Sequence, residues 1–229
     1  MTLDAQTHYL EQFANTADSH HASNTITRTL LHLLELSFNP KLNRSSALDN
    51  FIARLLRTLD YEAIDETVVM HVIIPFFICG EYRTAETTAC LLDRNGHIMM
   101  LVQADRQPSV PSDPESQLIA SAIAAFAENN RIRVDDLGLN PLDNMIFPAM
   151  TFVNAYPTFY KITVSKALSE GVKLGRYDYP NDYHPIAIDV FKYIPPHGGS
   201  GLRSLKYRKE ILAYMQAFRE LVVPLRSQK

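Results

Sequence analysis

Two apolar runs separated by a tight turn constrain this chain more than any other stretch. The runs cover residues 89–93 and 97–103, and Arg94-Asn95-Gly96-His97 lies between them. Asparagine followed by glycine suits the positive φ angles of a type I′ turn, which joins adjacent antiparallel strands. The sequence therefore predicts a β-hairpin whose second strand runs into Gln103-Ala104-Asp105-Arg106.

Helical and extended patterns alternate along the rest of the chain. Apolar residues at helical spacing predict a helix over residues 48–59, with Ser45 or Ser46 as its N-cap. Asp113 as N-cap and Pro114 in the first turn begin an alanine-rich helix suited to a crossover between strands. The other predicted elements are helices near residues 9–13, 27–36, 165–171 and 205–221, a strand from Val68 interrupted at Pro75, two strands joined near residues 155–157, and a strand over 186–193.

This order of elements predicts a mixed α/β (α+β) fold with one central mixed β-sheet flanked by helices. A length of 229 residues suits a single domain. We expect an N-terminal helical segment over residues 1–60, an α/β core over 61–195, and a hinge with a C-terminal helix over 196–229. The hinge falls in the Pro- and Gly-rich residues 194–201.

Net charge and the distribution of apolar residues predict where the protein is located and which classes of partner it binds. The net charge of −3 argues against a surface broadly coated for nucleic acid and leaves room only for a local basic groove. The N-terminus lacks a basic region followed by an apolar core, and no stretch approaches the roughly 18 apolar residues of a membrane span. We therefore expect an intracellular protein of the cytoplasm or nucleus that has no contact with membranes.

Cysteines and histidines give no zinc pattern. Cys79 and Cys90 lie inside apolar runs without a CxxC motif, which favours reduced, buried thiols. His32 is expected in the core or at an interface, and His71 and His97 are expected in the sheet.

Residues 80–106 read GEYRTAETTACLLDRNGHIMMLVQADR, and DPESQLIASAIAAFAENNRIR follows them. Together with the later FPAMTFVNAYPTFYKITV, they resemble an uncharacterised group of fungal proteins related to the PD-(D/E)XK (restriction-endonuclease-like) nuclease superfamily. The resemblance implies a nuclease-like core in which an Asp on one hairpin strand faces an acidic-x-Lys triplet on the next. Such carboxylates hold Mg²⁺ for phosphodiester hydrolysis.

The chain differs from that group at the positions that carry the catalytic chemistry. The resemblance places Thr88 where the group has Asp, and Gln103-Ala104-Asp105-Arg106 where it has Gln-Glu-Asp-Lys. Both expected metal-binding carboxylates are missing, whereas Arg106 keeps a charge suited to a phosphate or carboxylate. Gln117 matches a glutamine that often lines such pockets, and an exposed residue at the helix start is its alternative.

Three carboxylates remain open as relocated ligands: Glu81, Asp93 and Asp105. A regular strand places Asp105 on the opposite face from Ala104, although a β-bulge could turn it inward. Asp93 lies at the turn end of the hairpin and is expected to stabilise that turn, and Glu81 alone would hold Mg²⁺ only weakly. The sequence predicts no metal or cofactor, with Mg²⁺ as the alternative.

The densest basic run is Arg203, Lys206, Arg208 and Lys209. With Arg106 it is the candidate nucleic-acid contact, and a solvated helix face is the alternative. The sequence thus predicts a catalytically inactive PD-(D/E)XK-like domain that acts by binding, with a protein partner or a second copy favoured over nucleic acid. The alternatives are a Mg²⁺-dependent nuclease with relocated carboxylates and a non-catalytic intracellular scaffold or homo-oligomer.

Overall fold

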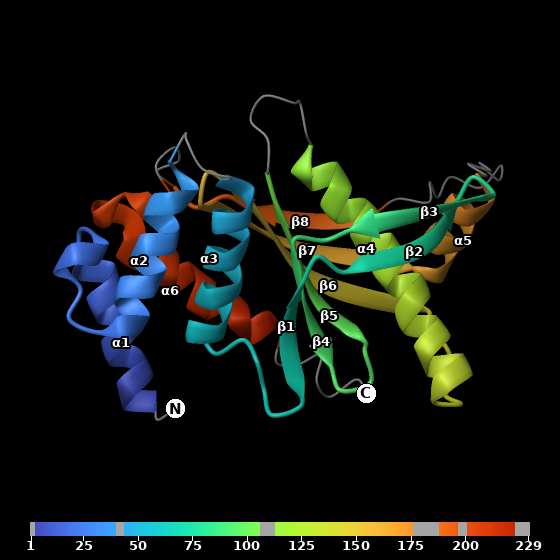
Figure 1. Cartoon of the computed structure of the whole chain (residues 1–229). Helices are drawn as coiled ribbons and strands as arrows, with labels where there is room; N and C mark the ends of the chain where they lie inside the picture. Colours follow the sequence, from blue (N-terminus) through green and yellow to red (C-terminus); the bar gives the residue numbers. More distant parts are fainter. Residues whose placement is uncertain (1–2, 40–43, 106–112, 176–187, 197–200, 223–229) are drawn as a thin grey trace.

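A computed structural model describes residues 3–39, 44–105, 113–175, 188–196 and 201–222 (Figure 1). The predicted mixed α/β class, with a mixed β-sheet flanked by helices, is confirmed. None of the helices in these ranges is long and apolar enough to cross a lipid bilayer. The helices and strands, in chain order, are α1 (Leu3–Asn15), α2 (Thr25–Ser37), α3 (Arg44–Thr58), β1 (Glu66–Met70), β2 (Ile73–Ile78), β3 (Glu81–Glu86), β4 (Ala89–Asp93), β5 (Ile98–Ala104), α4 (Pro114–Arg131), β6 (Asn144–Val153), β7 (Tyr156–Ser165), α5 (Lys166–Leu174), β8 (Asp189–Tyr193) and α6 (Leu205–Val222).

Six strands form one sheet in the order β1-β4-β5-β6-β7-β8, and β2 and β3 form a separate two-stranded ribbon. Figure 1 shows α1, α2, α3 and α6 on one side of the sheet, and α4, α5 and the ribbon on the other. Every residue of β5 is buried because helices cover both faces of this central strand. Val102 and Ala104 belong to the core beneath the first layer, whereas Leu101 belongs to the core beneath α4.

The predicted crossover helix is confirmed. Asp113 caps α4 by accepting a hydrogen bond from the Glu115 N–H, and Pro114 opens the first turn. The helix leads from β5 to β6, which pairs parallel to β5. Ala122 and Ala125 are completely buried, because small side chains let α4 lie close to the sheet.

The hairpin itself is confirmed, but its turn is not the expected type I′ turn. Gly96 has φ of 87°, whereas Asn95 is not in the left-handed region. The Gly96 N–H donates to the Asp93 carbonyl and the Asp93 N–H to the His97 carbonyl, which is a type I turn followed by a left-handed glycine. Positive φ at two successive turn residues occurs instead between β6 and β7, at Asn154 and Ala155.

The strand predicted from Val68 is in fact two strands, and β3 was not predicted. His71 has φ of 56° between β1 and β2, so the chain leaves the main sheet there. β2 then pairs with β3, and Pro75 lies opposite Thr84. A two-stranded ribbon consists only of edge strands, which is where proline is tolerated. His71 is therefore a linker residue and not the expected sheet residue.

The N-terminal helices and α6 form one layer. The Tyr61 hydroxyl donates to the Met215 carbonyl at 2.6 Å, and Arg219 Nη1 donates to the Leu59 carbonyl at 3.2 Å. The expected N-cap was wrong, because α3 begins at Arg44 and Ser45 and Ser46 lie inside its first turn. The His32 side chain is 61% exposed on α2, which excludes the expected core position and leaves the interface as a prediction.

The predicted hinge at residues 194–201 lies in part outside the described residues, as do residues 186 and 187 of the last predicted strand.

Candidate functional site

The two positions expected to carry metal-binding carboxylates lie in contact. Thr88 immediately precedes β4, and its Oγ1 accepts a hydrogen bond from the Ala104 N–H at 2.9 Å. Thr88 is 0% exposed and Ala104, at the end of β5, is 3% exposed. The Ala104 methyl group packs in the core shared with Phe152. These two side chains therefore fill a packed interior and supply no charged oxygen to a cation.

The other members of the expected motif are divided between the faces of the sheet. Gln117 is exposed on the first turn of α4 and accepts a hydrogen bond from Gln103 Nε2 at 2.8 Å. Because Gln103 and Ala104 are successive strand residues, Gln117 lies across the sheet from Ala104. Asp105 is partly buried, and its N–H donates to the Phe152 carbonyl. Arg106 lies outside the described residues.

The three candidate replacement ligands lie in three different places. Glu81 is exposed at the start of β3 and pairs with Arg83. Asp93 and Asp105 follow opposite ends of the hairpin, about 20 Å apart along a seven-residue strand. Within the described ranges, no three His, Cys, Asp or Glu side chains are arranged to hold a metal ion. Relocated Glu81, Asp93 and Asp105 therefore cannot share one Mg²⁺.

A histidine lies between two carboxylates beside Thr88. His71 Nε2 is 3.5 Å from Asp49 Oδ2, and His71 Nδ1 is 3.7 Å from Glu86 Oε1. The His71 N–H donates to the Thr88 carbonyl, so this cluster adjoins the expected nuclease position. The two carboxylates approach opposite nitrogens of one ring, so they do not converge on a common point.

The sequence analysis did not predict this cluster, although one member, Asp49, could have been recognised from its position in an apolar helix stripe. Asp49 is 2% exposed on α3 and shares its buried stripe with Ile52 and Leu56. An acid at helical spacing within an apolar stripe is unusual, because burying an unpaired carboxylate is costly. Nothing local marks His71 or Glu86 as its neighbours, since they lie on the linker after β1 and at the end of β3.

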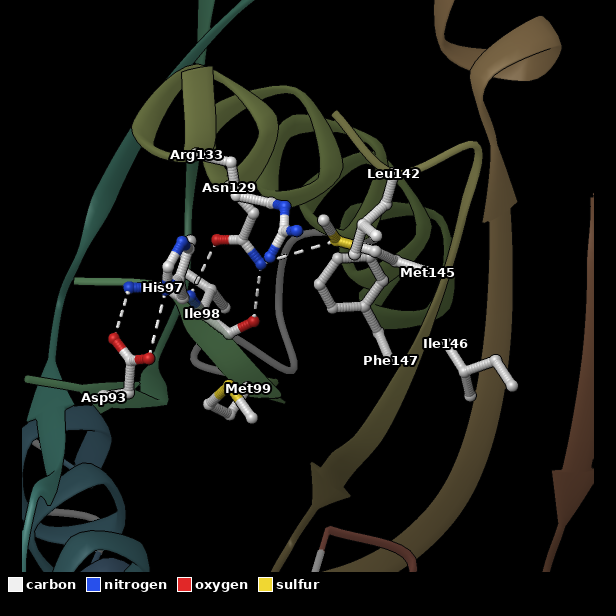
Figure 2. A pocket seen from close by; sticks show the side chains of 10 residues that line it. All are labelled: Asp93, His97, Ile98, Met99, Asn129, Arg133, Leu142, Met145, Ile146 and Phe147. Atoms are coloured by element: carbon white, nitrogen blue, oxygen red, sulfur yellow. Dashed lines mark hydrogen bonds and ion pairs between the residues drawn. The ribbon is translucent and has the colours of Figure 1, made fainter. Parts of the chain in front are cut away.

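A second acid–histidine pair lies at the opposite end of the hairpin and faces a cavity of about 60 Å³ (Figure 2). Asp93 Oδ1 accepts hydrogen bonds from the Asn95 and His97 N–H groups at 2.8 and 2.9 Å, which confirms its expected role in the turn. Asp93 Oδ2 is 3.0 Å from His97 Nδ1. Burial raises the pKa of Asp93, but the hydrogen bonds from His97 and Asn95 outweigh it, so the pKa is lowered overall.

His97 Nε2 is buried and has no hydrogen-bond partner within the described part of the chain. The cavity has room for a few water molecules, which satisfy such an atom in many proteins. Apolar side chains, among them Met99, Met145 and Phe147, form most of the wall. No serine, threonine or cysteine is among the lining residues, so the pair has no side-chain nucleophile to activate. We read it as a structural support of the turn.

The basic run at the start of α6 does not form one surface patch. Arg208 is 1% exposed, and its guanidinium donates to the Leu202, Phe13 and Thr16 carbonyls at 2.7, 2.9 and 2.6 Å. The prediction that Arg208 contacts nucleic acid is therefore wrong, because its guanidinium is buried and bonded to backbone carbonyls of the same chain.

The three remaining cations of the run are exposed, and two of them lie over aromatic rings. The Arg203 guanidinium is 4.9 Å from the centre of the Phe38 ring, and Lys206 Nζ is 5.0 Å from that of Tyr207. Lys209 is also exposed.

Comparison with protein-family models and with curated proteins gives no match for this chain. Its function has to be inferred from the geometry. The acid–histidine arrangements at the two ends of the hairpin do not provide a metal-binding group of carboxylates.

Proposed function

We propose that the chain is a catalytically inactive PD-(D/E)XK-like domain that acts by binding a protein partner. The observation that carries this proposal is the contact between Thr88 and Ala104. Mg²⁺ in such enzymes takes carboxylate oxygens in near-octahedral geometry. One of the two positions offers a hydroxyl already bonded to a backbone amide, and the other offers a methyl group.

The retained framework supports the same proposal. The β4–β5 hairpin, the α4 crossover and the parallel strand β6 pack through apolar side chains on both faces of the sheet. A domain of this kind keeps its shape when its ligands are lost, because the metal contributes nothing to the core. The surface of such a domain remains available for binding.

Charge favours a protein over a nucleic acid as the partner. The chain carries a net charge of −3, and the Arg208 charge is buried. Phosphate contacts supply most of the affinity of nucleic-acid binding and require several exposed cations together. Arg203, Lys206 and Lys209 alone give a small patch.

The test is hydrolysis of single- and double-stranded DNA and RNA by the full chain with Mg²⁺ or Mn²⁺, together with calorimetry for metal binding. We expect no turnover above a buffer control and no binding heat. Turnover that disappears in Asp105→Asn and persists in Glu81→Gln would overturn the proposal, because Glu81 is an exposed acid far from the hairpin end.

A gain-of-function variant tests the assignment of the two positions. Thr88→Asp combined with Ala104→Glu restores the expected carboxylates at adjacent sites. We expect Mg²⁺ or Mn²⁺ to raise the Tm of this variant and not that of the natural chain, since a bound metal stabilises the folded state. Absence of any metal-dependent shift in a folded variant would mean that these positions do not correspond to the nuclease ligands.

A Mg²⁺-dependent nuclease with a relocated carboxylate is the second candidate. It would depend on a single buried acid, Asp49, because the carboxylates of Asp49 and Glu86 do not converge on one point. Asp49 is a buried acid beside the expected site, so it is the acid on which any activity would depend. In that case Asp49→Asn would abolish turnover.

A further inference from the structure

The two edge strands of the main sheet, β1 and β8, differ in whether their outward backbone groups are hydrogen-bonded. At β1, the outward backbone groups of Val68 are bonded by side chains of the same chain. Its N–H donates to Glu62 Oε1 at 2.7 Å, and its carbonyl accepts from Arg57 Nη2 at 2.7 Å. Arg57 and Glu62 also pair with each other at 3.1 Å. This edge is closed, because a further strand would have to displace an ion pair.

The β2–β3 ribbon carries exposed charged side chains that oppose pairing with a further strand. Glu81, Arg83 and Glu86 are exposed along β3, and the first two form an ion pair. Charges along an edge strand oppose pairing with another strand, because they would have to be desolvated.

Among the described residues, no side chain caps the outward backbone groups of β8, although β8 carries two charged residues of its own. The sheet ends at β8, and no outward N–H or carbonyl of Asp189–Tyr193 is bonded to another described residue. Both charged side chains of β8 interact with residues of the same chain. Lys192 pairs with Glu115 of α4 and lies over the Tyr160 ring, and Asp189 Oδ2 accepts from Thr163 Oγ1 at 3.5 Å.

Exposed apolar side chains lie beside this open edge. Phe191 is 65% exposed and Tyr193 is 37% exposed. Both line a groove of about 280 Å³ between the last strands and α6, which Phe218 and Leu221 also line. Exposed aromatic side chains next to unpaired backbone are typical of a surface that receives another strand.

We propose that β8 pairs antiparallel with β8 of a second copy of this chain, about a two-fold axis that passes midway between the two Phe191 residues. In this register Phe191 faces its symmetry mate, Val190 faces Lys192, and Asp189 faces Tyr193. No like charges are opposed, so the strand is compatible with its own reverse. The axis is perpendicular to the sheet, and it therefore places both aromatic grooves on the same side.

Self-pairing satisfies both features of this edge at once. The second strand supplies donors and acceptors to the outward backbone groups, and its Phe191 ring covers the ring that is most exposed. Two-fold dimers are the commonest oligomers, because one patch then serves both partners. The inference goes beyond the proposed function, since β8 is separated from β5 by β6 and β7.

The oligomeric state of the full chain tests the proposal, by light scattering and sedimentation up to concentrations on the order of 100 μM, where a complex of micromolar Kd is largely formed. We expect a dimer for the natural chain and a monomer for Phe191→Lys. The matched control is Ile73→Lys, which places the same charge at a 63% exposed apolar position on the ribbon. This control is expected to remain dimeric, and circular dichroism checks that both variants are folded.

Cross-linking tests the register without requiring that the interface be weakened. Facing residues of antiparallel strands have Cα atoms about 4.5–5.5 Å apart, within the range of a disulfide. Phe191→Cys in a Cys79→Ser background should form a disulfide-linked dimer under mild oxidation, whereas Lys192→Cys should not.

Three results would overturn the proposal: a monomeric natural chain at the highest concentration, a dimer that survives Phe191→Lys, or a dimer that is lost in Ile73→Lys. A folded Phe191→Cys variant that does not cross-link would also reject it. None of these results depends on the hydrolysis assay, so this proposal and the proposed function fail separately.

Discussion

Replacing Arg208 by methionine should destabilise the whole fold. Methionine has a similar reach but no donors, so the carbonyls of Phe13, Thr16 and Leu202 would stay buried without the charged partner they have now. Phe13 and Thr16 lie at the end of α1, where the last helical carbonyls lack partners within the helix. Burial lowers the pKa of Arg208 to about 10, so its guanidinium is still charged at neutral pH.

The expected cost follows from these contacts. A hydrogen bond from a charged donor contributes about 1.5–3 kcal/mol, and the guanidinium also lies 4.9 Å from the centre of the Phe13 ring, which adds about 0.5–2 kcal/mol. Methionine recovers part of this, because it removes the cost of burying a charge. Three carbonyls left without a donor, at about 1–3 kcal/mol each and less this recovery, give an expected net loss of about 3–5 kcal/mol in the free energy of unfolding, which lowers the Tm of a chain of this size by about 6–20 °C.

Urea denaturation and thermal melting of the full chain measure this loss. The matched control is Lys209→Met, which removes the neighbouring charge at an exposed position and should change stability by less than about 0.5 kcal/mol. A loss below about 1 kcal/mol for Arg208→Met would refute the reasoning, because the guanidinium would then not satisfy these carbonyls.

Three further predictions concern single positions. Gly201→Ala should destabilise the protein by more than about 2 kcal/mol, because the new Cβ would lie 2.5 Å from the Ala155 carbonyl oxygen. Gly80→Ala should cost only about 1 kcal/mol, because Gly80 also has a positive φ but has open space around it. Thermal melts of the two variants test this difference. Asn129→Ala should cost about 2–4 kcal/mol by urea denaturation, because the amide bonds both backbone groups of one β5 residue at 2.8 and 2.9 Å. Folding lowers the pKa of Asp93, so its contribution is complete above about pH 4 and is lost as the pH falls through the lower folded value. Asp93→Asn should therefore destabilise the protein at pH 7 and flatten the acid side of its stability profile, and unchanged acid sensitivity would contradict this.

The parts of the fold that were predicted correctly have strong local signals. The hairpin runs, the Asp113-Pro114 start of α4 and the two strands around residues 154–155 all combine hydrophobic periodicity with turn or cap residues. The type of each turn was harder, because it depends on how the flanking strands are offset. Pairing shifts by one residue between Leu91 and Leu92, where Met99 is the extra residue on β5.

The β2–β3 ribbon escaped prediction for a physical reason. Nearly every residue of β3 is exposed, so the strand has no apolar alternation, and the left-handed turn at His71 leaves no mark in the sequence. The same holds for the candidate site. Asp49, His71 and Glu86 come from three elements, and only packing brings them together. Arg208 resembles a surface cation because the carbonyls that bind it lie up to 195 positions away.

The joining of α1 and α6 in one layer has a consequence for synthesis on the ribosome. The helices α1, α2 and α3 leave the ribosome before α6, yet the buried contacts of Phe13 and Tyr61 are completed only by Arg208 and Met215 of α6. Until then the nascent chain carries an uncovered apolar surface, and contacts between such distant residues form slowly. We expect growing chains of this protein to be clients of chaperones and to aggregate when translation stops before α6.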